Sequence, residues 1–188
     1  MAFWTTVNSA TNDPKRGFRW QISFDNLTED GDSVVWFAKK VSKPNFSITE
    51  SKHSFLNHNY YWPGRVEWQE ISLTLVDPVS PDAVSKTNQI IAKMGYAIPT
   101  GTTEDDMASM SKGKSKDALG VVKISQLDAG GKEIEIWTLQ SAWVKTVKFG
   151  ELSYEDDNLI EIELVLRYDW ATCEIAGKEG SPYYSKEG

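Results

Sequence analysis

The sequence predicts a mainly β fold with one α-helix packed against a sheet. The clearest pattern runs over residues 160–170, where every second residue is apolar and charged residues such as Glu161 and Glu163 fall between. A period of two is typical of a β-strand with one buried face, because a helix would scatter these side chains around its axis. Similar alternation recurs in several other stretches, and only residues 80–95 carry the start and stop signals of a helix.

The N-terminal part is expected to contain an arm followed by two strands. Residues 1–17 form the arm, and residues 18–24 then alternate between apolar and polar side chains. The turn-forming sequence NLTEDGDS precedes a second strand over residues 34–41, so these two strands are predicted to pair as a hairpin.

The apolar residues of segment 45–64 follow neither the period of two of a strand nor the 3.6-residue period of a helix. Aromatic side chains stand beside polar Asn57, His58 and Asn59, a mixture expected of an ordered projecting loop that docks on another surface. The alternative is a loop folded back on its own core. Pro63 and Gly64 are predicted to end this segment with a turn.

The second half of the chain continues the β pattern after one helix. A strand over residues 67–76 leads into the helix, with Ser80 as N-cap, Pro81 at its first position and Gly95 at its stop. A long loop follows over residues 96–120, and strands 121–127 and 132–139 flank a Gly-containing turn. The polar tail spans residues 174–188. The residues predicted to form the core are Phe18, Trp20, Ile22, Phe24, Ile71, Leu73, Leu75, Ile160, Ile162, Leu164, Leu166, Tyr168 and Trp170.

Length and composition exclude several classes of protein. The 188 residues fit a single domain, and a hydrophobic share of 40% with eight tryptophans argues against disorder. The net charge of -7 disfavours a general nucleic-acid binder. One cysteine, Cys173, allows no internal disulfide, and we expect neither a signal peptide nor a membrane span.

No catalytic or cofactor motif stands out, so an enzyme is not expected. The only histidines, His53 and His58, lack an acidic cluster at ligand spacing, and no nucleophile-elbow sequence surrounds Ser51 or Ser54. A glycine-rich phosphate loop is also missing from the sequence. The carboxylate pairs fall in turns or on one strand face, where solvation is the simpler explanation. No metal or cofactor is therefore expected.

Most of the chain resembles a known family of structural proteins. Residues 137–170, WTLQSAWVKTVKFGELSYEDDNLIEIELVLRYDW, resemble the tail tube proteins of contractile-tailed bacteriophages. The segments FAKKVSKPNFSI and PGRVEWQEISLTLVDP agree with that family in order and spacing, and the resemblance spans residues 18–170. It departs at residues 100–120, at the Tyr-Tyr-Trp of positions 60–62 and after Cys173.

This resemblance implies an antiparallel β-sandwich or half-barrel with a flanking helix. It implies that six copies close into a ring, that rings stack into a hollow inner tube, and that the tube serves as the conduit for DNA ejection. The implied partners are further copies of the chain, a tail sheath, baseplate and tail-terminator proteins, and genomic DNA in non-specific transit. The implied location is the virion tail, assembled in the host bacterial cytoplasm, with no membrane anchor and no cofactor.

Two sets of residues receive roles in such a tube. An acidic channel wall would repel DNA phosphates, and the candidates are Glu133, Glu135, Glu161 and Glu163. Stacking between rings is assigned to the arm and to the aromatic segment over 45–64, and the candidates are Trp4, Phe46, Phe55, Tyr60, Tyr61 and Trp62.

Three alternatives remain open. The chain could be a baseplate tube initiator rather than the repeating tube protein. It could also be the inner-tube protein of a contractile injection or secretion system that carries proteins. A more remote alternative is a monomeric carbohydrate-binding β-sandwich, suggested by the Trp and Tyr residues that look exposed.

Overall fold

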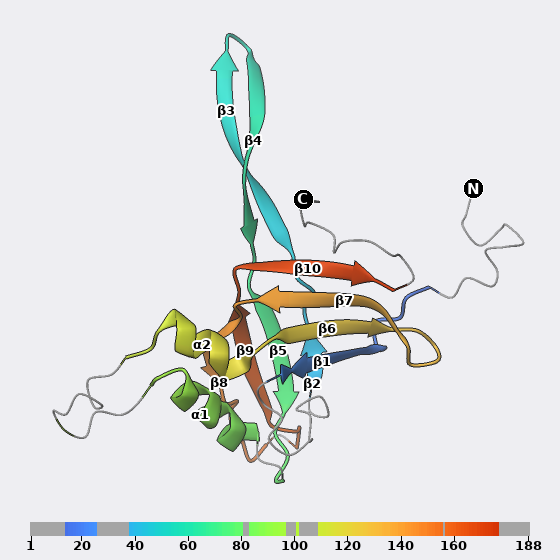
Figure 1. Cartoon of the computed structure of the whole chain (residues 1–188), viewed down its shortest axis with the longest axis vertical. Helices are drawn as coiled ribbons and strands as arrows, with labels where there is room; N and C mark the ends of the chain where they lie inside the picture. The colour runs from blue at the N-terminus through green and yellow to red at the C-terminus, as the bar shows by residue number, and fades with distance from the viewer. Residues whose placement is uncertain are drawn as a thin grey trace, which may run out of the picture.

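Two four-stranded antiparallel sheets form the body of the protein (Figure 1). The structure, a computed structural model, describes residues 14–25, 38–80, 83–96, 101, 109–155 and 157–176. Sheet A has the order β1 (Trp20–Phe24), β6 (Val122–Leu127), β7 (Glu133–Gln140), β10 (Trp170–Ile175). Sheet B has the order β2 (Ala38–Val41), β5 (Ile71–Val76), β9 (Glu161–Arg167), β8 (Trp143–Lys148). The mainly β, antiparallel class is confirmed.

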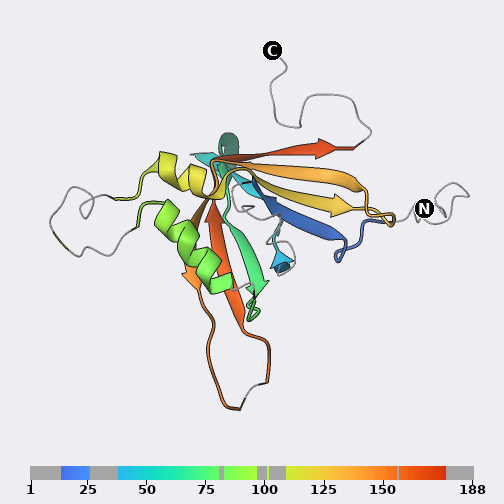
Figure 2. The same cartoon turned by 60° about the horizontal axis from the view of Figure 1, so that its bottom comes forward.

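The strands of the two sheets run in crossing directions, and the core lies between the sheets (Figure 2). Nine of the predicted core residues are buried, and Trp20 is partly buried against them. The nine are Ile22, Phe24, Ile71, Leu73, Leu75, Ile162, Leu164, Leu166 and Tyr168. One continuous apolar cluster therefore joins both sheets.

Three core predictions are wrong, since Phe18, Ile160 and Trp170 are 76%, 39% and 51% exposed. The alternation placed Phe18 and Ile160 inside strands, but both lie just outside the observed strands β1 and β9, so no opposing sheet covers them. Trp170 is exposed because the chain crosses from sheet B to sheet A between β9 and β10. After the crossing Ala171 is buried instead, so the phase of the alternation inverts.

The predicted long strand over 160–170 is thus two strands in different sheets. Leu164 pairs with Leu73 of β5, whereas Trp170 pairs with Gln140 of β7. The predicted hairpin of the first two strands is also wrong, because β1 pairs with β6 and β2 pairs with β5. The predicted hairpin of β6 and β7 is confirmed, and Asp128 Oδ1 fixes its turn by accepting from the Gly130 and Lys132 amides at 2.8 and 2.9 Å.

In the part of the chain that the structure describes, two helices rather than the single expected one pack beside sheet B. The predicted helix is α1 (Ala83–Lys93), and a second helix, α2 (Lys112–Leu119), contacts both α1 and β8. The prediction of an uninterrupted loop over 96–120 is therefore wrong at α2. Ser111 caps α2 by accepting from the Lys114 amide at 3.2 Å, and Leu119 is buried in the core. The helix sequence KGKSKDAL has three lysines and no regular apolar stripe, so the sequence pattern did not predict a helix here.

Candidate self-assembly surface

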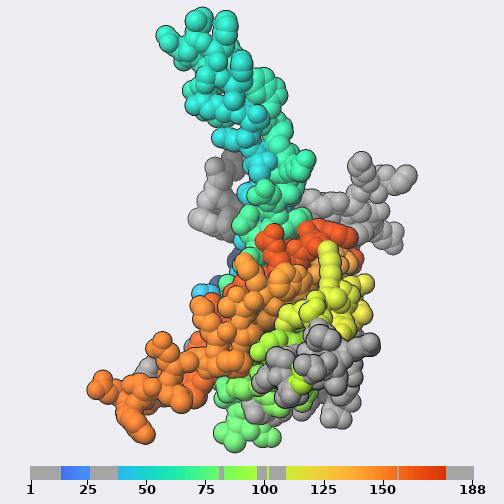
Figure 3. All heavy atoms as spheres, turned by 90° about the vertical axis from the view of Figure 1, so that its left-hand side faces the viewer, coloured from blue at the N-terminus to red at the C-terminus, as the bar shows by residue number. Residues whose placement is uncertain are grey.

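The most conspicuous surface is a two-stranded hairpin that projects from the body (Figures 1 and 3). It consists of β3 (Phe46–Phe55) and β4 (His58–Trp68), and every residue of both strands except Trp68 is exposed. The segment predicted as a projecting loop is therefore a projecting hairpin. An isolated two-stranded ribbon has little stability of its own in water, so this hairpin is suited to pairing with another surface.

The hairpin is built around an unusual turn and a bulge. Leu56 at the tip has a φ of 51° and is 86% exposed. The turn predicted at Pro63 and Gly64 is instead a register shift inside β4, opposite Thr49. Thr49 Oγ1 accepts from the Arg65 amide at 2.8 Å there. A Cβ on Gly64 would lie 2.3 Å from Thr49 Oγ1, so this close crossing requires glycine.

Beyond the bulge, the register places the large aromatic side chains unevenly on the two faces. His53 pairs with Tyr60, and Ser51 pairs with Trp62. Because side chains alternate along a strand, His53, Tyr60 and Trp62 share one face of the hairpin, and Phe55 lies on that face as well. The Trp62 ring lies 6.2 Å from the His53 ring and 6.3 Å from the Tyr60 ring. We call His53, Phe55, Tyr60 and Trp62 the aromatic face. Tyr61 lies on the opposite face, paired with Lys52.

A row of three aromatic rings anchors the base of the hairpin in the core. The Phe46 and Trp68 rings lie 5.1 Å apart, and the Trp68 and Tyr168 rings lie 5.9 Å apart. Burial raises the pKa of Tyr168 above its ordinary value of 10.0. The Gln69 amide also donates to the Asn45 carbonyl at 2.9 Å, which closes the base. Because these contacts fix the first pair of the ladder, they set the direction in which the hairpin leaves the body.

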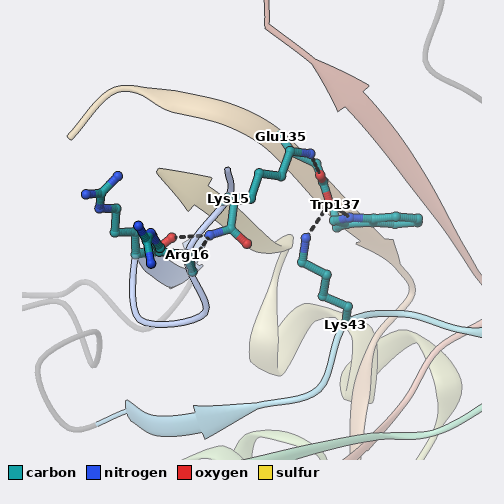
Figure 4. A network of polar contacts seen from close by, with 7 residues as sticks. Lys15, Arg16, Lys43, Glu135 and Trp137 are labelled. Carbon is teal, nitrogen blue, oxygen red and sulfur yellow. Dashed lines mark hydrogen bonds and ion pairs between the residues drawn. The ribbon is translucent and has the colours of Figure 1, made fainter. Parts of the chain in front are cut away.

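A buried carboxylate holds the segment that leads into β3 (Figure 4). The side chain of Glu135 is 10% exposed and forms an ion pair with Lys15. Lys43, which precedes β3, donates to Glu135 Oε1 at 2.6 Å, and Trp137 Nε1 donates to the same oxygen at 2.6 Å. Burial alone raises the pKa of Glu135, but these hydrogen bonds outweigh it and lower the pKa from 4.5 to about 2. Glu135 is therefore an anion that ties residues 15 and 43 to sheet A.

The four glutamates predicted to line a channel do not lie together. Glu133 and Glu135 are on β7 of sheet A, and a bulge in the β6–β7 register separates them, whereas Glu161 and Glu163 are on β9 of sheet B. Three of the four are ion-paired: Glu135 as above, Glu161 with Lys39, and Glu163 with Lys148 at 2.7 Å. Glu133 accepts from Gln21 Nε2 at 2.8 Å. A single unpaired acidic face does not form, and a channel-lining role for these residues stays a prediction.

The residues predicted to stack between rings lie in two parts of the hairpin, its outer strands and its base. Phe55, Tyr60, Tyr61 and Trp62 are about half exposed on the outer hairpin, and Phe46 is 37% exposed at its base. Trp4 lies outside the described residues. The roles of Trp68, Lys43 and Lys15 could not be predicted from the sequence, because their partners Tyr168 and Glu135 lie far away in the chain.

Within the described ranges, the histidines and the cysteine do not belong to a metal-ligand cluster. No three His, Cys, Asp or Glu side chains group as metal ligands there, and none of the helices seen there is long and apolar enough to cross a membrane. His53 and His58 are exposed on the hairpin. Cys173 is buried, and that burial raises the pKa of its thiol and disfavours the reactive thiolate.

No protein-family model and no curated protein matches the sequence. Several solved structures share the fold. A chain of the six-fold symmetrised baseplate of the anti-feeding prophage aligns with a TM-score of 0.60 and 14% identity, over 88% of this chain and 99% of that chain.

Two further matches come from an extracellular contractile injection system named PVC. A chain of its sheath–tube complex in the extended state has a TM-score of 0.58 and 13% identity, over 92% of this chain and 99% of that one. A chain of its sheath/tube terminator in the extended state has a TM-score of 0.58 and 14% identity, over 86% of this chain and 97% of that one. At these identities the likeness is one of fold, and it covers nearly the whole of each matched chain.

Proposed function

We propose that this chain, which shares its fold with chains of contractile injection assemblies, is a structural subunit of a contractile tail tube. One observation carries the proposal. The β3–β4 hairpin is an ordered ribbon of exposed aromatic residues that projects from a well-packed body. A ribbon of this kind gains stability when a second surface covers it, and in a repeating assembly that surface belongs to another copy.

In the proposed assembly, six copies associate head to tail into a closed ring, and rings stack along an axis. In the monomer each sheet has two edge strands, β1 and β10 in sheet A and β2 and β8 in sheet B. Ring closure would cover edges that otherwise invite aggregation. A six-fold ring agrees with the six-fold symmetrised assembly in which one similar chain is found. The proposed partners are a sheath, a baseplate and a terminator, and the role is mechanical, with no catalytic step and no cofactor.

The proposed cargo of the tube is DNA in a phage virion. The net charge of -7 supports passage of a polyanion, because like charge disfavours binding to the wall. Glu161 and Glu163 are neutralised in part by their lysine partners, so these two carboxylates contribute less to the repulsion of DNA phosphates. The proposed repulsion therefore depends on the net charge of the whole chain. The second candidate is the tube of a protein-delivering injection system, and the fold shared with the PVC chains favours it.

Imaging tests the assembly. Negative-stain electron microscopy of the purified chain at rising concentration should show rings and hollow tubes. Replacing Tyr61 and Trp62 together by Ala should leave folded monomers with short tubes or none. A stable monomer at every concentration would exclude a tube subunit, and wild-type tube lengths in the double variant would exclude the hairpin as the stacking element.

The content of assembled particles distinguishes the two cargoes. Particles purified from producing cells should contain encapsidated DNA that resists nuclease until the tail contracts. Particles with protein in the lumen and no DNA would favour the injection system instead.

A further inference from the structure

One buried carboxylate joins the N-terminal arm to the base of the hairpin (Figure 4). Glu135 Oε2 forms an ion pair with Lys15, and Oε1 accepts from Lys43 Nζ and Trp137 Nε1, each at 2.6 Å. Lys15 precedes β1, whereas Lys43 precedes β3 and therefore the hairpin. Two segments that belong to different sheets thus share a single anion.

On the arm side, the contact of Lys15 is separate from the contacts that fix the backbone. Gln126 Nε2 donates to the Arg16 and Arg19 carbonyls at 2.7 and 2.6 Å, and the Leu127 amide donates to the Arg19 carbonyl at 2.9 Å. These bonds hold the chain from residue 16 onward against β6. The side chain of Lys15 is 49% exposed. Its ammonium can therefore leave the carboxylate while the backbone contacts of residues 16 and 19 stay in place.

On the hairpin side, the contact of Lys43 lies beside the hydrogen bond that closes the base. The Asn45 carbonyl accepts there from the Gln69 amide at 2.9 Å. Only Pro44 separates Lys43 from Asn45, and the proline ring restricts the backbone between them. The tether of Lys43 therefore limits how far Asn45 can move, and with it how often the base opens.

The two lysines compete for the charge of Glu135. Two ammonium groups beside one carboxylate repel each other, so each weakens the net attraction that the other gains. Trp137 Nε1 keeps Oε1 in place, and water can replace the half-exposed ammonium of Lys15 at Oε2. Loss of the Lys15 contact therefore leaves a one-to-one pair between Lys43 and Glu135, which holds the base of the hairpin more tightly.

We propose that Glu135 is a joint through which the N-terminal arm controls the hairpin. When the Lys15 side chain leaves Glu135, Lys43 binds the carboxylate more tightly and the base of the hairpin opens less often. A neighbouring copy that takes up the arm would in this way stiffen the hairpin of the same subunit. The joint is a property of the monomer, so it can be tested whether or not the chain forms tubes.

Hydrogen exchange of the Gln69 amide in the full-length monomer, followed by NMR, tests the joint. Lys15→Met should slow this exchange about two- to threefold, because the lysines are partly exposed and solvent screens their repulsion. Lys43→Met should speed it by at least the same factor. The matched control is Lys148→Met, which removes a lysine paired with Glu163 and should leave the exchange unchanged. Thermal unfolding checks that each variant is folded.

The dependence on Glu135 separates the joint from a general effect of removing a positive charge. In a Glu135→Gln background, and equally in a Lys43→Met background, Lys15→Met should no longer slow the exchange of Gln69. Two results would overturn the proposal. One is exchange in the single Lys15→Met variant that is unchanged or faster than in the wild type. The other is slowing by Lys15→Met that persists when position 135 carries no charge.

Discussion

The two-sheet body and the β3–β4 hairpin use the same strand geometry with opposite results. In β9 every second side chain is buried, and Ile162 and Leu166 are fully inaccessible. In β3 and β4 both faces are exposed up to the last residue of β4. The body is therefore stable through its own core, whereas the outer hairpin contributes little to the stability of the monomer. This difference predicts that substitutions in the two regions affect different measurements.

The largest effect on stability is expected in the body. Leu164→Ala should lower the free energy of unfolding by about 2–5 kcal/mol, because it removes a buried side chain and leaves a cavity between the sheets. Trp62→Ala, the comparison in the hairpin, should change it by less than about 0.5 kcal/mol and act on assembly instead. Urea denaturation measures both. A large loss of stability for Trp62→Ala would contradict the distinction between the regions.

The next largest effect involves Glu135, at the junction of the two regions. The pKa of Glu135 in the folded protein, about 2, is below its ordinary value of 4.5, so its contribution to stability is full above pH 4.5 and is lost as the pH falls toward 2. At neutral pH this contribution is about 2 kcal/mol, allowing for the partly exposed lysines. The stability difference between wild type and Glu135→Gln should therefore shrink between pH 4.5 and 2 in urea titrations. Exposed Glu174→Gln is the control, and a constant difference would rule out the proposed ionisation.

A smaller effect is expected at the aromatic row. Trp68→Ala should cost about 1–2 kcal/mol through its two ring contacts and lost burial. It should also speed amide hydrogen exchange throughout β3 and β4, because the base of the ladder is no longer fixed. Hydrogen exchange of the monomer by mass spectrometry measures this. Unchanged exchange in the hairpin would show that the row does not anchor it.

The smallest effect on the monomer is expected at the hairpin bulge. Gly64→Ala forces a Cβ against Thr49 and should distort the outer hairpin, at a cost of about 1 kcal/mol or less in monomer stability. Tube formation should nevertheless fall sharply, because the aromatic face turns away from its partner. Gly113→Ala in α2 is the matched control, since nothing lies within 4 Å of its Cβ position. Tubes of normal length from Gly64→Ala would show that the bulge does not aim the hairpin.

A sizing column provides a check against the remote alternative. A protein that stays monomeric and binds glycans would use the aromatic face as a carbohydrate surface. Formation of rings and tubes would exclude a monomeric carbohydrate-binding protein. If glycans bind, weaker binding by the Trp62→Ala variant than by the wild type would place the carbohydrate site on the aromatic face.

The sequence by itself determined that the class is mainly β, the positions of several strands of the body, and most of the buried set, because alternation along one strand reports directly which side chains face a core. It also pointed to residues 45–64 as a projecting, aromatic segment. It could not identify α2, since Lys112, Gly113 and Lys114 supply no apolar stripe and the helix depends on packing of Ala118 and Leu119 in the core.

Apart from the β6–β7 hairpin, only the tertiary structure decided which strands pair. The alternation over 160–170 continues smoothly through Tyr168, yet the chain leaves sheet B there and joins sheet A, which exposes Trp170. The same limitation applies to Glu135, which the strand pattern grouped with three other glutamates and the fold paired with Lys15 and Lys43. Periodicity depends on neighbours two residues apart, whereas ladders, ion pairs and the direction of the hairpin depend on contacts between distant segments, which form only when the sheets pack.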